Sequence, residues 1–389
     1  MNILFFDEPA LRSALLPLTF TRPTAELRVG IYTIREKWQT YYTHAHCYFQ
    51  TELYLQGKFP FTDKADLNIN GAVCPNERLI HEIQKLNANE ALVYQGHVLA
   101  FKGSIKKRID YFQDVLIIKT PSDLFTHNGA EIRNDYALIT NGRKSVALND
   151  PHTIVYNPEN VFIEEGVKIR AAIINAEDGP VYLGKDVEIQ EGAIIKGPFA
   201  ACQGAVVAMG AKMRGDTSLG PFCKVGGEVS NTIFIGYSNK VHDGFIGNSV
   251  IGEWCNLAAG TNISNLKNNY SNIKVYSYQT NDLVDSGKIF HGLIMGDYSR
   301  CGINAMFNTG SVVGVSCNIY DAGFPPKFTP SFAWGSATGY IDFRIEDALE
   351  VAKRGMMRRK VELSGEDERI LRHVFDQDAP LRAELFKKN

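Results

Sequence analysis

The sequence contains no apolar run long enough to cross a bilayer. None of its hydrophobic stretches reaches the roughly 18 residues that a transmembrane helix needs. The opening residues MNILFFDEPALR also lack a basic region ahead of an apolar one. Neither membrane insertion nor secretion is signalled, so we expect a cytoplasmic protein with no membrane partner.

An excess of one charge is missing as well. The 41 Lys and Arg residues nearly balance the 43 Asp and Glu residues, for a formal net charge of −2. Nucleic-acid-binding domains usually present a basic surface, and acidic disordered tails need runs of like charge. Both are excluded as the main feature of the chain, and small molecules are the expected partners.

Cysteine is sparse, and its spacing fits neither a metal site nor a redox motif. The seven cysteines are odd in number and include no CxxC pair. Four of them, Cys223, Cys255, Cys301 and Cys317, fall on the apolar tracks described next, where a free thiol acts as a small apolar filler. The absence of GxSxG and of a Walker phosphate loop argues against a serine hydrolase and a P-loop nucleotidase.

What the sequence does contain is a six-residue repeat. One track of apolar or small residues recurs at every sixth position, and a second track follows it by four. The first comprises Leu183, Ile189, Ile195, Ala201, Val207, Met213, Leu219 and Val225; the second comprises Val187, Ala193, Phe199, Ala205, Ala211, Thr217, Cys223 and Val229. A period of six fits neither an α-helix nor a flat strand, and it predicts a parallel β-helix with short faces.

The repeat continues toward the C-terminus with interruptions. After Val225 the next aliphatic in phase is Ile235, and the same step of ten recurs from Val241 to Ile251, so we expect residues looped out at a corner. The Asn-rich stretch 264–291 lacks the period and is expected to be an inserted loop. Loops of this length usually carry function, which makes it our first candidate for a substrate lid.

These patterns divide the chain into three parts. Residues 1–150 alternate strands with helices as in an α/β domain, residues 151–335 form the solenoid with its inserted loop, and residues 336–389 are helical and cap the open end. The expected strands are 1–6, 91–101 and 137–140, and the expected helices are 31–42, 77–86, 121–127, 345–361 and 366–375. The segment 323–335, rich in Pro, Gly and aromatic residues, is expected to leave the solenoid in an extended form.

Arginines gather between the first strand and the first long helix, in and around the segment LLPLTFTRPTAELRVG at 15–30. Guanidinium groups and free helix N–H groups both favour an anion, so Arg12, Arg22 and Arg28 are candidates for binding nucleotide phosphates. A structural turn is the alternative, because prolines interrupt the segment.

A second set of arginines occurs in the C-terminal helical region. Arg354, Arg358 and Arg359 follow helical spacing, and a solvated helix face is the simplest interpretation. The alternative is a basic patch near an anionic cofactor.

The runs KVGGEVSN at 224–231 and SNKVHDGFIGNSVIGEWCNLAAGT at 238–261 resemble the acetyltransferase half of the bifunctional N-acetylglucosamine-1-phosphate uridyltransferase and glucosamine-1-phosphate acetyltransferase. The whole chain is similar to a divergent branch of that sugar nucleotidyltransferase family, often labelled glucose-1-phosphate thymidylyltransferase. The resemblance implies a Rossmann-like nucleotidyltransferase domain and then a left-handed parallel β-helix with three hexapeptides per coil. It also implies a homotrimer and an acyl-CoA site in a groove between neighbouring subunits.

The resemblance assigns His242 the role of general base. An ammonium group must lose a proton before its nitrogen attacks a thioester, and imidazole is the side chain that titrates near neutral pH. A structural histidine at a corner of the solenoid is the alternative.

Further positions match residues that hold the substrates in the family. Asn256 and Asn265 fall where amides hold the sugar and its acetyl group, Ala259 falls where the backbone contacts acetyl-CoA, and Lys212 falls where a basic residue meets the sugar phosphate. Lys240, two residues before His242, is an independent candidate for binding an anion. The alternatives are that Asn256 serves only to form a tight turn and that Lys212 is exposed to solvent without binding a ligand.

The chain also departs from the family pattern. Ser230 stands in place of a second basic residue beside the sugar phosphate, Phe245 replaces a hydroxylated aromatic, and AAGT replaces GAGT at 258–261. These changes suggest a different acceptor or a rearranged pocket, with Lys267 and Lys274 of the Asn-rich loop as substitutes for the lost phosphate contact.

The N-terminal half departs further, because the GxGTR loop and the PK pair of sugar nucleotidyltransferases are absent. If this half is active, transfer from a nucleoside triphosphate to a sugar phosphate would need Mg²⁺, with Asp7 or Asp135 as the candidate ligand.

The sequence therefore predicts a sugar-phosphate transferase of nucleotide-sugar biosynthesis. It would transfer acetyl from acetyl-CoA to an amino-sugar phosphate in the solenoid, with nucleotidyl transfer in the N-terminal domain as a further activity. The alternatives are a hexose-1-phosphate thymidylyl- or uridylyltransferase without acyl transfer, and a noncatalytic trimer that binds a nucleotide sugar.

Overall fold

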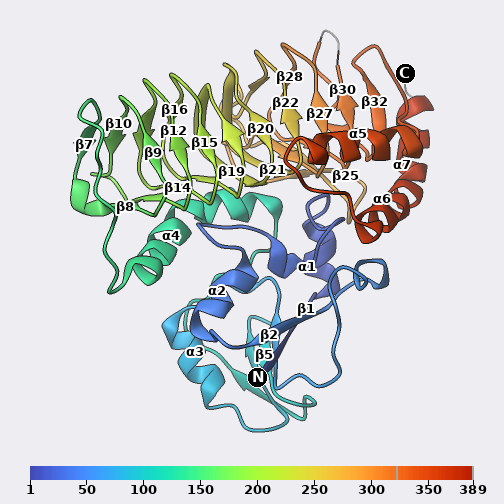
Figure 1. The fold of residues 1–389 in the computed structure, drawn as a ribbon. Helices are drawn as coiled ribbons and strands as arrows, with labels where there is room; N and C mark the ends of the chain where they lie inside the picture. Colours follow the sequence, from blue (N-terminus) through green and yellow to red (C-terminus); the bar gives the residue numbers. More distant parts are fainter. Residues whose placement is uncertain (321–322, 388–389) are drawn as a thin grey trace.

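The computed structural model describes residues 1–320 and 323–387; residues 388 and 389 of the predicted C-terminal segment lie outside this range. A parallel β-solenoid runs along the molecule, the N-terminal domain lies against one of its sides, and three helices gather at its C-terminal end (Figure 1). The fold class expected from the sequence is confirmed in these three parts. Among the described residues, no helix combines the length and apolar character of a membrane span.

The N-terminal domain is built on a mixed sheet with strand order β2-β1-β3-β5-β4-β6. Its strands are β1 (Asn2–Phe6), β2 (His46–Gln50), β3 (Leu67–Asn70), β4 (Glu90–Tyr94), β5 (His97–Phe101) and β6 (Lys107–Asp110). Strand β1 pairs in parallel with β2 and β3, whereas β5 is antiparallel to both β3 and β4. The shorter helices are α1 (Pro9–Ala14), α2 (Ile34–Tyr41) and α3 (Glu77–Gln84), and the 3-10 turns are η1 (Thr24–Glu26) and η2 (Leu53–Leu55).

Helix α4 (Pro121–Thr140) corrects one expectation, because its last turn includes the residues 137–140 that were expected to form a strand. The helix begins with a capping box between Thr120 and Asp123, and proline occupies its first turn, where a missing N–H costs nothing. Buried side chains then recur at helical spacing from Leu124 to Ile139. The short apolar run at 137–140 is therefore the end of one long amphipathic helix.

From Val181 to Val225 the solenoid coils stack in parallel with an 18-residue register. Leu183 pairs with Ala201, Ile195 with Met213, and Val207 with Val225. Three hexapeptides per coil, as the resemblance implied, account for this spacing. The inward side chains form one continuous apolar column, which includes all four cysteines expected there as filler.

The coils present three faces, which we call faces 1, 2 and 3 in chain order. Face 1 consists of β7 (Ile154–Tyr156), β10 (Ile173–Asn175), β13 (Ile194–Lys196), β16 (Lys212–Met213), the first halves of β19 (Glu228–Gly236) and β21 (Phe245–Glu253), β23 (Asn262–Ile263) and β28 (Met306–Phe307). Face 2 consists of β8 (Val161–Ile163), β11 (Val181–Leu183), β14 (Phe199–Ala201), β17 (Thr217–Leu219), the second halves of β19 and β21, β26 (Leu293–Met295), β29 (Ser311–Val313) and β31 (Phe328–Thr329). Face 3 consists of β9 (Lys168–Ile169), β12 (Glu188–Ile189), β15 (Val206–Val207), β18 (Lys224–Val225), β20 (Asn239–Lys240), β22 (Asn256–Leu257), β27 (Arg300–Cys301), β30 (Asn318–Ile319) and β32 (Ala333–Ser336). The 3-10 turn η3 (Pro158–Asn160) joins β7 to β8, and β33 (Gly339–Asp342) adds an antiparallel strand to β32.

The interruptions of the repeat have a different cause from the one expected. Val225 pairs with Lys240, and Leu219 pairs with Phe234, each only 15 positions later. One coil is therefore shortened, and no residues are looped out in phase with Val225. The residue that seemed to continue the inward track, Ile235, lies outside the solenoid among side chains buried against the N-terminal domain.

Face 2 is the side on which the N-terminal domain lies. Its outward side chains belong to the same buried cluster as side chains of β1, β3 and α2: Ile233, Ile235, Val250, Ile294 and Val312. Helix α4 runs along this face, below the solenoid in Figure 1. The apolar outward positions of face 2 are thus explained by the domain that covers them.

Face 1 has no such cover in its first coils. Ile154, Ile173 and Ile194 pair in register across three coils, and they are 52%, 36% and 44% exposed. An isoleucine column on a water-facing sheet is typical of a surface that another molecule covers.

The inserted segment 264–291 forms a hairpin of β24 (Lys274–Ser277) and β25 (Asp282–Asp285). Tyr278 packs edge-on against Phe20, Tyr276 stacks on Phe328 at 3.5 Å, and the Gln279 side chain donates to the carbonyl of Ala10. These contacts tie the hairpin to the N-terminal domain and to the last coils, so it does not form the lid expected from its length.

The segment 323–335 differs from the expectation, whereas the C-terminal helices lie within the expected region 336–389. Trp334 pairs with Asn318 and Gly335 with Ile319, so the segment 323–335 does not leave the solenoid but ends in one more coil strand. The helices α5 (Ile345–Met357), α6 (Gly365–Gln377) and α7 (Ala379–Lys387) follow. Helices α5 and α6 were expected near these positions, whereas α7 was not.

Candidate functional site

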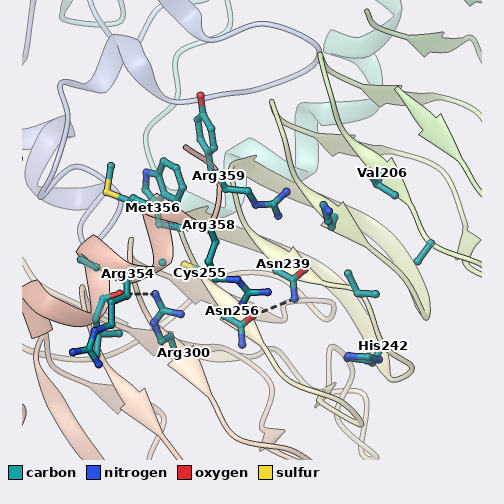
Figure 2. A pocket seen from close by; sticks show the side chains of 18 of the residues that line it. Val206, Asn239, His242, Cys255, Asn256, Arg300, Arg354, Met356, Arg358 and Arg359 are labelled. Atoms are coloured by element: carbon teal, nitrogen blue, oxygen red, sulfur yellow. Dashed lines mark hydrogen bonds between the residues drawn. The ribbon is translucent and has the colours of Figure 1, made fainter. Parts of the chain in front are cut away.

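A groove of about 670 Å³ lies between face 3 and helix α5. Strands β18, β20, β22 and β27 contribute its floor, and residues 351–359 of and just after α5 contribute one wall. Figure 2 shows the arginines at the α5 side, Asn239 and Asn256 in the middle, and His242 at the other end. The volume is in the range of sites for small organic ligands.

His242 lies at the corner where face 3 turns into face 1. Its imidazole is exposed and has no hydrogen-bond partner among the described residues. The corner requires glycine above and below, because a Cβ on Gly226 would lie 1.9 Å from the Val241 carbonyl and one on Gly244 would lie 2.0 Å from the Thr261 carbonyl. The chain thus presents a free imidazole on a backbone that is closely stacked between coils.

Lys240 supports this corner from inside the solenoid. It occupies the inward position between Val225 and Leu257, it is fully buried, and its Nζ donates to the carbonyl oxygens of His242 (2.6 Å) and Asp243 (3.2 Å). Burial lowers the pKa of Lys240 to about 8. The expectation that it binds a substrate anion is wrong for this geometry, because the ammonium group faces the interior.

A column of polar side chains crosses the floor of the groove. Successive coils place Lys224, Asn239, Asn256 and Arg300 in register, and Asn239 donates to the Asn256 side-chain oxygen at 3.1 Å. Asn256, expected from the resemblance, therefore shares the groove with His242. Arg300 was not singled out from the sequence, although it precedes the inward Cys301 as Lys224 precedes Val225.

The remaining expected residues of the solenoid lie beside the groove. Ala259 occupies the next coil at the same corner as His242, where Gly260 N donates to Asp243 O. Lys212 is exposed on face 1, and Asn265 donates to Asn248 at 2.8 Å near the start of the inserted hairpin. His242 and Asn256 line the same groove, Ala259 lies in the next coil at the His242 corner, and Lys212 and Asn265 lie on the other side of that corner.

The three N-terminal arginines are buried and already paired. Arg12 donates to the Thr19 carbonyl and lies 3.3 Å from Asp7, and Arg22 pairs with Asp297 and Glu253 of the solenoid. Burial opposes the charge of Arg22, but these two carboxylates outweigh it and raise the pKa of the guanidinium above its usual value.

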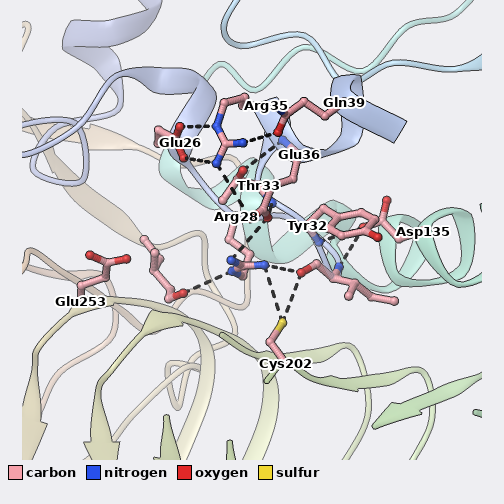
Figure 3. A network of polar contacts seen from close by, with 12 residues as sticks. Glu26, Arg28, Tyr32, Thr33, Arg35, Glu36, Gln39, Asp135, Cys202 and Glu253 are labelled. Carbon is pink, nitrogen blue, oxygen red and sulfur yellow. Dashed lines mark hydrogen bonds and ion pairs between the residues drawn. The ribbon is translucent and has the colours of Figure 1, made fainter. Parts of the chain in front are cut away.

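Arg28 belongs to a second network at the domain interface (Figure 3). It donates to the carbonyls of Ile31 and Ile235 and lies 3.6 Å from Glu36. None of the three arginines faces an open phosphate site, which corrects the expectation. Arg12 makes its contacts within the N-terminal domain, whereas Arg22 and Arg28 link that domain to the solenoid.

The two candidate metal ligands, Asp7 and Asp135, already make hydrogen bonds or ion pairs with other groups of the protein. Asp7 accepts hydrogen bonds from Thr24 N (2.9 Å) and Thr51 Oγ1 (2.6 Å). Asp135 lies 2.6 Å from Lys37 Nζ and caps the backbone N–H of Ile31, and burial raises its pKa to about 6. Within the described part of the chain, no group of three or more His, Cys, Asp or Glu side chains is placed to hold a metal. These residues do not fit a magnesium site.

Three other polar side chains lie together at the carboxyl ends of the parallel strands β1 and β3 of the N-terminal sheet. Glu8 follows β1, Asn70 ends β3 and His97 begins β5, so the topology brings them to one edge. Glu8 accepts from Asn70 Nδ2 at 3.0 Å and lies 2.9 Å from His97 Nδ1, and both Glu8 and His97 are partly exposed. Ligands of α/β sheets bind at the carboxyl ends of parallel strands. The position of Glu8 directly after the first strand was the sequence signal for this set.

Comparison with known proteins supports the two-part architecture. Residues 3–144 match the family model described as sugar nucleotidyl transferase. The chain is 31% identical over 160 residues to the bifunctional sugar-1-phosphate nucleotidylyltransferase/acetyltransferase of Sulfurisphaera tokodaii, covering 41% of this chain and 37% of that protein. It is 25% identical over 219 residues to the bifunctional protein GlmU of Wolbachia pipientis, covering 46% of this chain and 49% of that protein. The resemblance expected from the sequence is confirmed at modest identity, and the chain spans about half the length of these curated relatives or less.

Among solved structures, the polySia specific acetyltransferase NeuO is similar at 13% identity with a TM-score of 0.28. The match covers 50% of this chain and 83% of that chain.

The buried Lys240 gives the solenoid a characteristic pH dependence. The unfolded chain keeps this proton up to a pKa near 10.5, whereas the folded chain loses it near 8. Since the unfolded state binds more protons between these values, the free energy of unfolding should rise with pH across the window, by on the order of 2 kcal/mol. Lys240→Met removes this contribution.

Urea unfolding of the parent and of Lys240→Met at pH 7.5 and pH 10 measures the difference, and groups common to both proteins cancel. Lys185→Met, at an exposed position of the same solenoid, is the control and should follow the parent. Parallel pH profiles for the parent and Lys240→Met would contradict the buried, shifted ammonium group.

Proposed function

We propose that this chain is a sugar-phosphate transferase of nucleotide-sugar biosynthesis whose solenoid transfers acetyl from acetyl-CoA to the amine of an amino-sugar phosphate. The observation that carries the proposal is His242, an exposed and unpaired imidazole at the end of a cationic groove. The names of the similar proteins, which include a nucleotidylyltransferase/acetyltransferase, support the same class of chemistry. The cytoplasmic location stays a prediction from the sequence.

The reaction uses His242 as a base. The sugar nitrogen attacks the thioester carbonyl, so that a C–N bond forms and the C–S bond breaks. His242 Nε2 or Nδ1 takes the proton that the nitrogen loses, and the proton then passes to the departing thiolate, so charge and atoms balance. The imidazole is free to do this because no neighbouring group holds it.

Neighbouring groups have separate roles in this proposal. Asn256, in the groove, hydrogen-bonds the substrate beside the base, and backbone at Ala259 contacts the acyl donor. Lys212 and Asn265, on the face 1 side of the corner, bind the phosphate and the sugar of the acceptor. Lys240 is a positioning residue, because it acts through the carbonyl of His242.

A homotrimer would complete this site. His242 lies at the edge shared by face 3 and face 1, and face 1 carries the exposed isoleucine column. A second copy packed against face 1 would bury that column and enclose the acceptor side of the corner. We therefore propose that face 1 is the subunit interface.

Replacing the base tests the reaction. His242→Ala should reduce acetyl transfer to glucosamine 1-phosphate by about 100-fold or more, because a positioned base contributes roughly 10² to 10⁴ in rate. Release of free thiol from acetyl-CoA measures the rate. His152→Ala, at an exposed position of the first coil, is the matched control and should keep the parent rate. Full activity of His242→Ala would exclude the proposed mechanism.

Replacing the central isoleucine tests the interface. Ile173→Glu should convert the trimer to monomers, because it places a charge in the apolar column that the interface would bury. Analytical ultracentrifugation gives the mass directly. Leu53→Glu, at a position that is 83% exposed on the N-terminal domain, should leave the assembly intact. A monomeric parent, or an unchanged mass for Ile173→Glu, refutes the interface.

Nucleotidyl transfer by the N-terminal domain is the second candidate function. The match of residues 3–144 to the sugar nucleotidyl transferase model favours it, and the polar edge of Glu8, Asn70 and His97 is the candidate site. In this proposal the side chains of that set orient the phosphates. His97 can donate to them through the ring nitrogen that does not contact Glu8. Glu8 orients that ring, and the buried Asn70, whose amide hydrogens go to Glu8 and the Val98 carbonyl, holds Glu8 in place.

We expect the parent to release pyrophosphate from a nucleoside triphosphate only when a hexose 1-phosphate is present. Glu8→Gln should slow this release by about tenfold, because it weakens the contact that orients the His97 ring. Glu52→Gln, exposed in the same domain, should have no effect. If no nucleotide and sugar combination releases pyrophosphate, the domain is a binding or structural unit.

A further inference from the structure

The arginine end of the groove holds an unusual excess of positive charge. Arg300 from face 3 and Arg358 and Arg359 from the end of α5 all line it, with Lys224 on the floor. Among the described residues, none of these four cations lies within 4 Å of a carboxylate. The carboxylate in the lining, Glu188, is engaged with Arg170.

Arg300 is the most constrained of these cations. Its Nε is buried and has no hydrogen-bond partner among the described residues, and its Nη2 makes only a long contact of 3.5 Å with the Val351 carbonyl. Burial lowers the pKa of Arg300, and the like charge of Arg358 lowers it further. Arg359 is affected in the same way. Guanidinium groups remain charged at neutral pH, so such a cluster is stabilised when an anion joins it.

The chain at this point is shaped to admit the guanidinium of Arg300. Helix α5 carries Gly355 where a Cβ would lie 2.6 Å from Arg300 Nη2. Glycine in the interior of a helix costs roughly 1 kcal/mol relative to alanine. Gly355 therefore lowers the stability of helix α5 but leaves the space that the Arg300 guanidinium occupies in the groove.

Aromatic side chains lie beside the same cluster. Tyr237 and Trp254 occupy equivalent corner positions of successive coils, both line the groove, and their rings stack at 4.2 Å. Phe222 extends the stack by one coil on the other side of Tyr237. A planar heterocycle can pack against such a surface.

We propose that this end of the groove binds the diphosphate of a nucleotide, with the diphosphate on Arg300, Arg358 and Arg359 and the base against Tyr237 and Trp254. A diphosphate presents several oxygens to guanidinium forks, which bind phosphate through paired N–H groups. The site lies within one chain, between the solenoid and its own helix α5. Both coenzyme A and nucleotide sugars carry a nucleoside 5′-diphosphate group.

The inference deepens the proposed function, because a donor anchored at the arginines would extend along the groove toward His242. Binding is separable from catalysis. It is measured on the His242→Ala protein, so that loss of transfer and loss of binding are different results.

Calorimetric titration of full-length His242→Ala with ADP, coenzyme A and UDP-glucose tests the proposal. ADP should bind, adenosine should not, and affinity should fall as salt rises because the contact is electrostatic. Tighter binding of coenzyme A than of UDP-glucose identifies the acyl donor as the occupant, and the reverse order identifies a nucleotide sugar. The intrinsic fluorescence of Trp254 should change on binding, and Trp254→Phe should remove that change.

Two sets of variants make the assignment specific. Arg300→Gln, Arg358→Gln and Arg359→Gln should each weaken ADP binding by about tenfold or more, since each removes a charged hydrogen bond. Arg344→Gln, directly before helix α5, is the control, because Arg344 is exposed, lies 3.6 Å from Asp347 and does not line the groove, and its effect should stay within a few-fold.

Gly355→Ala is a variant that keeps the helix and moves only the guanidinium of Arg300. It should fold at least as well as the parent and bind ADP more weakly. Gly365→Ala, where a Cβ meets nothing within 4 Å, should bind as the parent does. Absence of ADP binding, equal binding of adenosine and ADP, or unchanged affinity in all three arginine variants overturns the proposal.

Discussion

The parallel register between successive coils is the constraint on which the rest of this structure depends. Backbone hydrogen bonds place each residue directly over its counterpart, so one residue type per coil becomes a column on a face. Close stacking then requires glycine at corners such as Gly226 and Gly244, where a side chain would collide with the next coil. A coil that closes with fewer residues changes the phase of everything after it. That is how Lys240 comes to occupy an interior position beneath His242.

The outward side chains of the three faces differ in polarity because each face has different neighbours. Face 2 is apolar outside as well as inside, since the N-terminal domain buries it. Face 3 is polar and forms a groove with the chain's own helix α5. Face 1 keeps an exposed isoleucine column. The N-terminal domain therefore blocks one side of the solenoid and leaves two sides open around the corner that holds His242.

The repeat predicted the fold because a six-residue period has few structural explanations. It also predicted the buried cysteines. The family resemblance, and not the repeat, singled out His242 and Asn256, which line the same groove. The repeat failed at Ile235, because an outward residue that packs on another domain has the same apolar character as an inward one. The interpretation of Arg22 as a phosphate ligand failed because its partner Asp297 lies 275 positions away in the sequence. Arg300 was also missed, because nothing local indicates that α5 folds back over face 3.

The arginines of this chain show why location decides function for a given residue type. Arg22 and Arg28 look like phosphate ligands in the sequence, but both lie where carboxylates or carbonyls already neutralise or accept from them. Burying such a charge is tolerable only when it is paired. Arg300 and Arg359 are partly buried without that compensation, and a glycine in α5 preserves the arrangement. A cation that is neither paired nor fully hydrated raises the free energy of the empty groove. An anion that binds there removes this cost, and it does so beside the corner where His242 is free to accept a proton.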